Sequence, residues 1–145
     1  DKCKVAAVSN AYVLAPWADI LVSHDGNWWR NYPDAINFKG RKFCRNHYQG
    51  TERFIIPGVP FCNSGLLAMH ICEALGAKKI ILLGYDMKGT HFFGEHPKPL
   101  SNPTKVKFNR FSHEFTSWDG CEVVNCTPDS ALDVFQKAVL QDVLR

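Results

Sequence analysis

The feature that most constrains the fold is a set of short, continuously apolar runs separated by helical patterns. The clearest is residues 79–84 (KIILLG), a β-branched and leucine-rich stretch bounded by glycine. Continuous rather than alternating apolarity is typical of strands covered on both faces, and therefore of a parallel sheet. Similar runs lie at residues 4–9, 20–23 and 122–125, with a weaker one at residues 53–56. Together they predict a mainly parallel sheet of about five strands.

Helical patterns alternate with these runs. Residues 64–75 carry apolar side chains on one helical stripe and stop at Gly76, a residue type that commonly follows helices. Residues 104–118 predict an amphipathic helix, and residues 130–144 predict a last helix. This alternation predicts a Rossmann-like α/β three-layer sandwich, formed by a single domain over residues 1–145. The expected core contacts of the last two helices are Val106, Phe108, Phe111, Phe115, Leu132, Phe135, Val139, Leu140 and Val143.

The composition is that of an ordinary globular domain. Hydrophobic residues make up 46% of the chain and charged residues 21%, unlike a disordered protein. The net charge is +3 without a clustered Lys/Arg stripe, so we expect no dedicated nucleic-acid binding. A phosphate-bearing small ligand accounts for the positive surplus equally well. No apolar run reaches the ~18 residues of a membrane span, so no membrane partner is expected.

Cysteine usage bears on the compartment. Four of the six cysteines lie within or beside apolar stretches, as free buried thiols do: Cys3, Cys62, Cys72 and Cys126. Free thiols fit a reducing environment, so we expect a cytoplasmic location. The pairs Cys44–His47 and Cys121–Cys126 do not favour structural zinc, because the second pair straddles a predicted strand.

Polar, small and acidic side chains follow each predicted strand. Ligands of open parallel sheets bind outside the carboxyl ends of the strands, so these side chains are the candidates for a binding site. The predicted ligand-binding residues are Asn10, Asp25, Asn63, Ser64, Gly65 and Asp86.

Asn63, Ser64 and Gly65 form the most informative of these groups, because they stand at the start of a predicted helix. Backbone N–H groups and the helix dipole attract an anion there, although Asn63 or Ser64 can equally serve as a helix cap. Asp86 can accept hydrogen bonds from sugar hydroxyls, hold a divalent metal ion or cap a turn, and Asp25 has the same alternatives.

A histidine-rich segment follows the strongest strand. His91 and His96 flank an aromatic pair and Glu95. A histidine can act as a general base with Glu95 to orient it, so these three residues are the candidate catalytic groups. A two-histidine metal site and a plain surface loop are the alternatives.

Other signals narrow the function further. The paired Trp28 and Trp29 face different ways on a helix, so we expect one in the core and the other free to stack on a base or sugar. The sequence has no dinucleotide-binding glycine motif, Walker loop or nucleophile elbow, which disfavours dehydrogenase, P-loop and hydrolase functions.

The chain resembles a group of phage and prophage proteins of unknown function. The resemblance covers nearly the whole chain: residues 5–19 (VAAVSNAYVLAPWAD), 24–29 (HDGNWW), 63–65, 76–77, 83–87 (LGYDM), 90–91, 94–97 (GEHP), 125–128 (NCTP) and 130–132. More distantly, the Ser-Gly helix start and the Gly-x-Asp strand end are similar to the DUF115/MptE-like proteins and to CMP-sialic-acid-dependent sialyltransferases.

This resemblance implies a nucleotide or nucleotide-sugar ligand. In the relatives, the residues that match Asn10, Ser64 and Gly65 contact a nucleotide, and a histidine matching His91 or His96 serves as base. The relatives begin with an additional strand and a phosphate-contacting Gly-Pro-Ser loop, whereas this sequence starts after that point. We therefore expect an open sheet edge and a homo-oligomer that covers it, in the host cytoplasm if the protein is viral.

Two function hypotheses from different classes follow. The first is an enzyme-like nucleotide or nucleotide-sugar binding domain, a glycosyltransferase-like or phosphotransfer enzyme in which His96 deprotonates an acceptor with help from His91 or Glu95. The second is a phage protein without turnover that sequesters a nucleotide, such as a host immune signal. A structural or interaction module is a third, weaker hypothesis.

Overall fold

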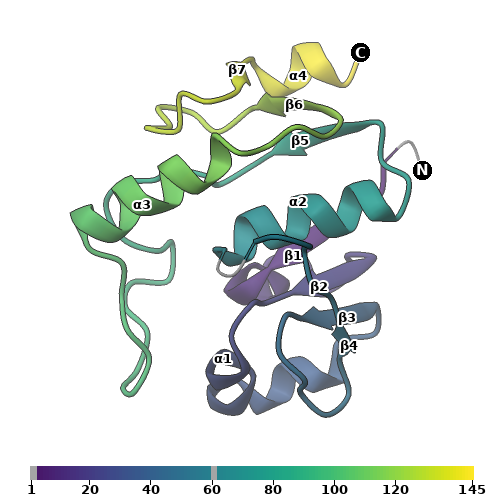
Figure 1. Cartoon of the computed structure of the whole chain (residues 1–145), viewed down its shortest axis with the longest axis vertical. Helices are drawn as coiled ribbons and strands as arrows, with labels where there is room; N and C mark the ends of the chain where they lie inside the picture. The colour runs from purple at the N-terminus through teal and green to yellow at the C-terminus, as the bar shows by residue number, and fades with distance from the viewer. Residues whose placement is uncertain (1–2, 60–61) are drawn as a thin grey trace. The chain divides into compact units, whose positions relative to one another are not determined.

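The computed structural model describes residues 3–59 and 62–145, which fall into two compact units (Figure 1). Unit 1 comprises Asp1–Ile71 and Pro97–Leu100, and unit 2 comprises Cys72–His96 and Ser101–Arg145. The boundary at Ile71 falls inside helix α2 (Ser64–Ala74). None of the helices in the described residues is long and apolar enough to cross a membrane.

Unit 1 contains a four-stranded parallel sheet whose spatial order is the chain order, β1-β2-β3-β4 (Figure 1). All three neighbouring pairs are parallel, so each connection returns the chain to the same end of the sheet. The strands are β1 (Ala6–Val8), β2 (Ile20–Val22), β3 (Arg41–Cys44) and β4 (Glu52–Arg53).

Short helices connect these strands: the 3₁₀ helix η1 (Ser9–Val13), α1 (Gly26–Asn31) and the 3₁₀ helix η2 (Pro33–Asn37). Both tryptophans of α1 are buried, since Trp28 is 4% and Trp29 1% exposed. Tyr12 and Tyr32 contact the ring of Trp28, and Tyr48 stacks on Trp29. The expectation that one tryptophan is free to stack on a ligand is therefore wrong, because aromatic side chains from the flanking segments already cover both rings.

Unit 2 contains a three-stranded parallel sheet of order β5-β6-β7. Its strands are β5 (Lys79–Leu82), β6 (Glu122–Asn125) and β7 (Gln136–Lys137), and its helices are α3 (Lys105–Phe115) and α4 (Leu140–Val143). Thr104 caps α3 by accepting a hydrogen bond from the Lys107 backbone N–H. The fully buried Phe115 holds the helix against Tyr85 and Phe135.

The α/β class with parallel strands is confirmed, and the architecture is compatible with a Rossmann-like sandwich. The expected sheet of about five strands is replaced by sheets of four and three strands. The sequence pattern did not indicate β3, which begins with two charged residues and buries only Phe43 and Cys44, or the exposed β7. The predicted strand at residues 53–56 is paired only at its first residue, Arg53.

The predicted helix over residues 130–144 is wrong, because only Leu140–Val143 is helical. The Ser130 side chain explains the difference. Its Oγ donates to Tyr85 O and accepts from the Leu132 N–H, which fixes residues 130–132 in a turn. Val106 and Val139 were expected in the core but are 77% and 61% exposed. The buried residue of α3 is Phe115, at its C-terminal end.

All six cysteines are free thiols in the structure. Cys44, Cys62 and Cys126 are buried and Cys72 is half-buried, whereas Cys3 is exposed, against its apolar sequence context.

Two glycines offer a matched test of packing in unit 1. A β-carbon on Gly40 would overlap Asp19 O, which accepts the Arg41 N–H at the start of β3, whereas one on Gly26 meets nothing within 4 Å. We expect Gly40→Ala to lower the free energy of unfolding by about 1–3 kcal/mol. Gly26→Ala, in helix α1, should be neutral or slightly stabilising. Urea unfolding of both variants measures the difference, and equal stabilities would contradict the close approach of Gly40 to Asp19.

Candidate functional site

The carboxyl edge of the four-stranded sheet brings together the ends of three neighbouring strands. Val8 pairs with Val22, and Val22 pairs with Phe43, so the residues that follow them lie level with one another. These following residues are Ser9, Ser23 and Cys44. The Ser9 and Ser23 hydroxyl oxygens are 3.2 Å apart, which places two hydroxyl groups side by side at this edge.

Ser9 has an unusual backbone conformation. Its φ of 47° lies in the left-handed region, which is uncommon for a residue other than glycine. Such conformations persist where the surrounding structure enforces them, and they concentrate at functional sites. Here the enforcing contact is at the next residue: Asn10 is 7% exposed, and its Oδ1 accepts a 2.7 Å hydrogen bond from Trp28 Nε1. Asn10 thus anchors η1 to the core and holds Ser9 at the strand end.

His24 joins three elements at the same edge. Its backbone N–H donates to Ser64 Oγ at 3.0 Å, which attaches the N-terminus of α2 to the end of β2. Its carbonyl oxygen lies 3.5 Å from Cys44 Sγ, at the end of β3. The β2 and β3 ends and the α2 N-terminus therefore meet at one residue. Gly65, the next residue after Ser64, is carried with it in the first turn of α2.

Two of the predicted ligand-binding side chains act as helix caps. Asp25 accepts the Asn27 N–H at 2.8 Å and caps α1. Asn63 Oδ1 accepts the Leu66 N–H at 2.9 Å in the first turn of α2. Because Asn63 performs this capping, the Ser64 hydroxyl is directed to His24 instead.

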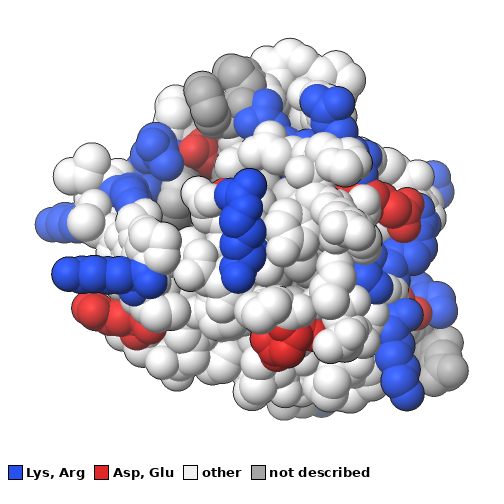
Figure 2. Space-filling view, turned by 90° about the horizontal axis from the view of Figure 1, so that it is seen from below, with Lys and Arg blue, Asp and Glu red and all other residues white. Residues whose placement is uncertain are grey.

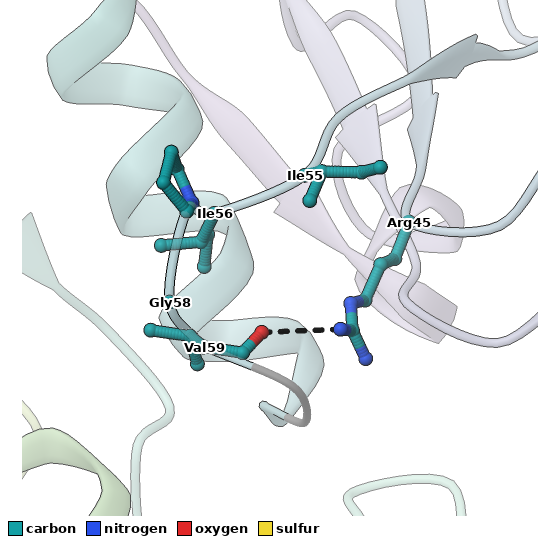
Figure 3. Close-up of a pocket in the computed structure, with 6 residues that line it drawn as sticks. Arg45, Ile55, Ile56, Gly58 and Val59 are labelled. Atoms are coloured by element: carbon teal, nitrogen blue, oxygen red, sulfur yellow. Dashed lines mark hydrogen bonds between the residues drawn. The ribbon is translucent and has the colours of Figure 1, made fainter.

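Arg45, which the sequence pattern did not indicate, follows β3 at this edge. It lines an open depression of about 360 Å³ together with the segment from Ile55 to Val59 (Figure 3). Its guanidinium donates to Val59 O at 3.1 Å, and Figure 3 shows the side chain extending towards that segment. Arg45 was missed because β3 was not predicted. The apolar pair Phe43 and Cys44 directly before it was the available signal.

The candidate catalytic residues belong to unit 2. His91 stacks flat on Phe93, with centroids 4.8 Å apart, and His96 packs edge-on against His91 at 4.6 Å. The buried His91 Nε2 has no hydrogen-bond partner among the described residues. Glu95 is exposed, so the group that orients the His91 ring is Phe93. The His96 backbone N–H donates to Asn102 Oδ1 at 2.7 Å, which ties down the end of this segment.

The predicted site residues therefore form two sets. Unit 1 assembles Asn10, Asp25, Asn63, Ser64 and Gly65 at one sheet edge, and unit 2 contains Asp86, His91, Glu95 and His96. Asp86 follows β5 with an exposed side chain, and its carbonyl oxygen accepts the Ala131 N–H at 2.8 Å.

Polar residues at the end of β6 and directly after it form a closed structural network. Asn125 Nδ2 donates to Ser130 Oγ and Leu132 O, and Asn125 Oδ1 accepts the Thr127 N–H. The Thr127 hydroxyl accepts the Tyr85 N–H at 3.0 Å. These buried groups satisfy one another, so their role is to hold the β5 and β6 ends together.

No group of three or more His, Cys, Asp or Glu side chains able to hold a metal ion occurs within residues 3–59 and 62–145. Comparison of the chain with protein-family models, curated proteins and solved structures finds no match.

The histidine cluster predicts a pH dependence of stability. Burial lowers the pKa of His91, and burial together with the neighbouring His91 lowers the pKa of His96. The unfolded chain, with histidine pKa values near 6.5, binds more protons than the folded chain below that pH. The stability that comes from burying the two neutral imidazoles is therefore fully present above about pH 6.5. The free energy of unfolding then decreases as the pH falls towards the lower pKa values of the folded state.

Urea unfolding between pH 7.5 and 5 measures this loss. His91→Phe keeps an aromatic ring beside Phe93 but removes one titrating group, so it should flatten the fall in stability below pH 6.5. The imidazole proton resonances of His91 and His96 should titrate at lower pH in the folded protein than in urea. Equal titration in both states would refute the effect of burial.

Proposed function

We propose that this chain binds the phosphate group of a nucleotide or nucleotide sugar at the carboxyl edge of the four-stranded sheet. The observation that carries the proposal is the hydrogen bond from His24 N–H to Ser64 Oγ. It joins the N-terminus of an 11-residue helix to the end of a central strand, where parallel α/β sheets commonly bind ligands.

Electrostatics at this edge suit a phosphate. The N-terminus of α2 carries the positive end of the helix dipole, and backbone N–H groups in its first turn point out of the helix. Arg45 adds a guanidinium, whose planar donors match phosphate oxygens in a bidentate arrangement. The half-buried Ser9 hydroxyl stands at the adjacent strand end, where it can accept from the buried Ser23 hydroxyl and donate its own hydrogen to the same ligand.

A small phosphorylated ligand is favoured over a nucleic-acid backbone. On the face shown in Figure 2, the centre carries few Lys and Arg side chains, and those that gather along one side of the view are interrupted by Asp and Glu. Binding along a nucleic acid requires several phosphate contacts in a row, which a continuous stripe provides.

The histidine cluster supplies the chemistry for the enzymatic form of this proposal. The lowered pKa of His91 and of His96 keeps both imidazoles neutral at pH 7, the state in which a general base accepts a proton. The enzymatic hypothesis assigns His96 of unit 2, with His91 beside it, as the base that deprotonates an acceptor, and turnover rather than the geometry of unit 1 tests it. Retention of the ligand without turnover is the alternative that the experiment separates.

Affinity measurements on Arg45 test the binding site. Native mass spectrometry of the full chain with CMP, UDP, GDP, ADP and their sugar conjugates reports bound ligand and subunit number together. We expect Arg45→Gln to weaken binding about tenfold or more, because a hydrogen bond to a charged group contributes about 1.5–3 kcal/mol. Arg110→Gln, on α3 of unit 2, is the matched control and should bind as the wild type does. Equal affinities for the two variants would remove Arg45 from the site.

Substitution of Ser64 tests the helix terminus. Ser64→Tyr places a bulky ring at the junction of α2 and β2 and should abolish binding. Ser117→Tyr, at an exposed position, should not. Circular dichroism and the unfolding midpoint establish that each variant folds. If folded Ser64→Tyr binds normally, the ligand does not sit at this edge.

Turnover is tested with His96→Ala and mass spectrometry of products after incubation with a nucleotide sugar and lactose. A transferase loses product formation in this variant while keeping its affinity for the nucleotide. A sequestering protein holds the ligand stoichiometrically and forms no product, with or without His96.

A further inference from the structure

Unit 1 has a second depression, of about 480 Å³, on residues that the proposed phosphate site does not use. It lies between the segment around η1 and the segment around η2, and Tyr12, Trp17, Asp34 and Asn37 are among its lining residues. We call it the Trp17 groove.

Trp17 is the most unusual side chain of this groove. It is 71% exposed, although its neighbour Ala18 is buried in the core of unit 1. Tryptophan is highly buried on average, and exposed apolar surface that is rimmed by polar residues is typical of a ligand-binding groove. Here the polar groups are present on η2.

Asp34 and Asn37 lie on the same side of η2. Residues three apart eclipse one another in a 3₁₀ helix, so the carboxylate and the amide project in nearly the same direction. The Tyr12 hydroxyl donates to Asp34 Oδ2 at 2.7 Å and fixes the carboxylate in position. Burial and this hydrogen bond raise the pKa of Tyr12 well above its usual value, so the phenol remains a donor.

The charged side chains that line the groove balance one another. Asp34 and Lys39 are both lining residues and carry opposite charges, so they leave no net charge. Phe38, which is buried, contributes apolar surface between Asn37 and Lys39. The groove therefore combines an exposed aromatic face, a fixed carboxylate and an amide without a net charge.

We propose that the Trp17 groove binds the ring of a neutral saccharide. One face of a sugar ring consists largely of C–H groups, which pack against the electron-rich face of an indole. Its hydroxyls lie at the ring edge, where the Asp34 carboxylate accepts from them and the Asn37 amide both donates and accepts. This site is additional to the proposed phosphate site and shares no lining residue with the Arg45 depression.

Calorimetric titration of the full chain with maltotriose, lactose and chitotriose tests the proposal, with saturation-transfer NMR to detect weak binding. At least one of the three should bind at concentrations up to about 10 mM, a range that covers weak small-ligand affinities. Trp17→Ala and Asp34→Asn should each weaken that binding tenfold or more. Tyr12→Phe removes only the bond that fixes Asp34, so its effect should be smaller. Leu14→Ala, 66% exposed but outside the groove, is the control and should bind as the wild type does.

Three results would overturn the proposal. The first is no binding of any of the three saccharides, and the second is unchanged binding by Trp17→Ala and Asp34→Asn. The third is binding of a proline-rich peptide, which aromatic grooves also accept, at Trp17 without saccharide binding. Arg45→Gln separates the two proposals, because it should lose nucleotide affinity while saccharide affinity stays unchanged.

Discussion

The buried hydrogen bond between Trp28 Nε1 and Asn10 Oδ1 is the interaction on which most of unit 1 depends. It satisfies two polar groups inside an aromatic core and fixes η1 against α1. A broken bond would leave both groups unpaired in an apolar environment, which typically costs about 1–3 kcal/mol for each group. The same short helix then carries Ser9 to the sheet edge and Tyr12 to the Trp17 groove. Both proposed binding surfaces are therefore positioned by one internal contact.

The sequence pattern predicted the elements whose stability comes from apolar burial. Strands β1, β2, β5 and β6 and helices α2 and α3 all match continuous apolar runs or helical stripes. Strands β3 and β7 owe their place to backbone pairing with a neighbour, and side-chain periodicity does not report such pairing. The last predicted helix failed for a different reason. Three hydrogen bonds of the Ser130 hydroxyl hold this segment out of a helix, although Leu132 and Phe135 have helical spacing.

The position of the candidate site could be predicted from the sequence, but the roles of several of its residues could not. Strand ends of a parallel sheet are where polar residues gather, and the structure brings Ser64 to the end of β2 as that rule suggests. The roles of Asp25 and Asn63 could not be assigned from sequence, because a carboxylate or amide that caps a helix looks the same as one that holds a ligand. Arg45 could be assigned to the site only once β3 was known. The exposure of Trp17 could be recognised only from the folded arrangement of both 3₁₀ helices.

The short segment Pro97–Leu100 gives the two units an interlaced connectivity. The chain passes between them three times, after residues 71, 96 and 100. Leu100 packs on the aromatic core of unit 1, although the stretches before residue 97 and after residue 100 belong to unit 2. A gene fragment that ends at residue 71 would lack this part of its own core. Neither unit is therefore one continuous stretch of sequence, and a chain shortened to unit 1 would have to keep residues 97–100 joined to it by a new connection.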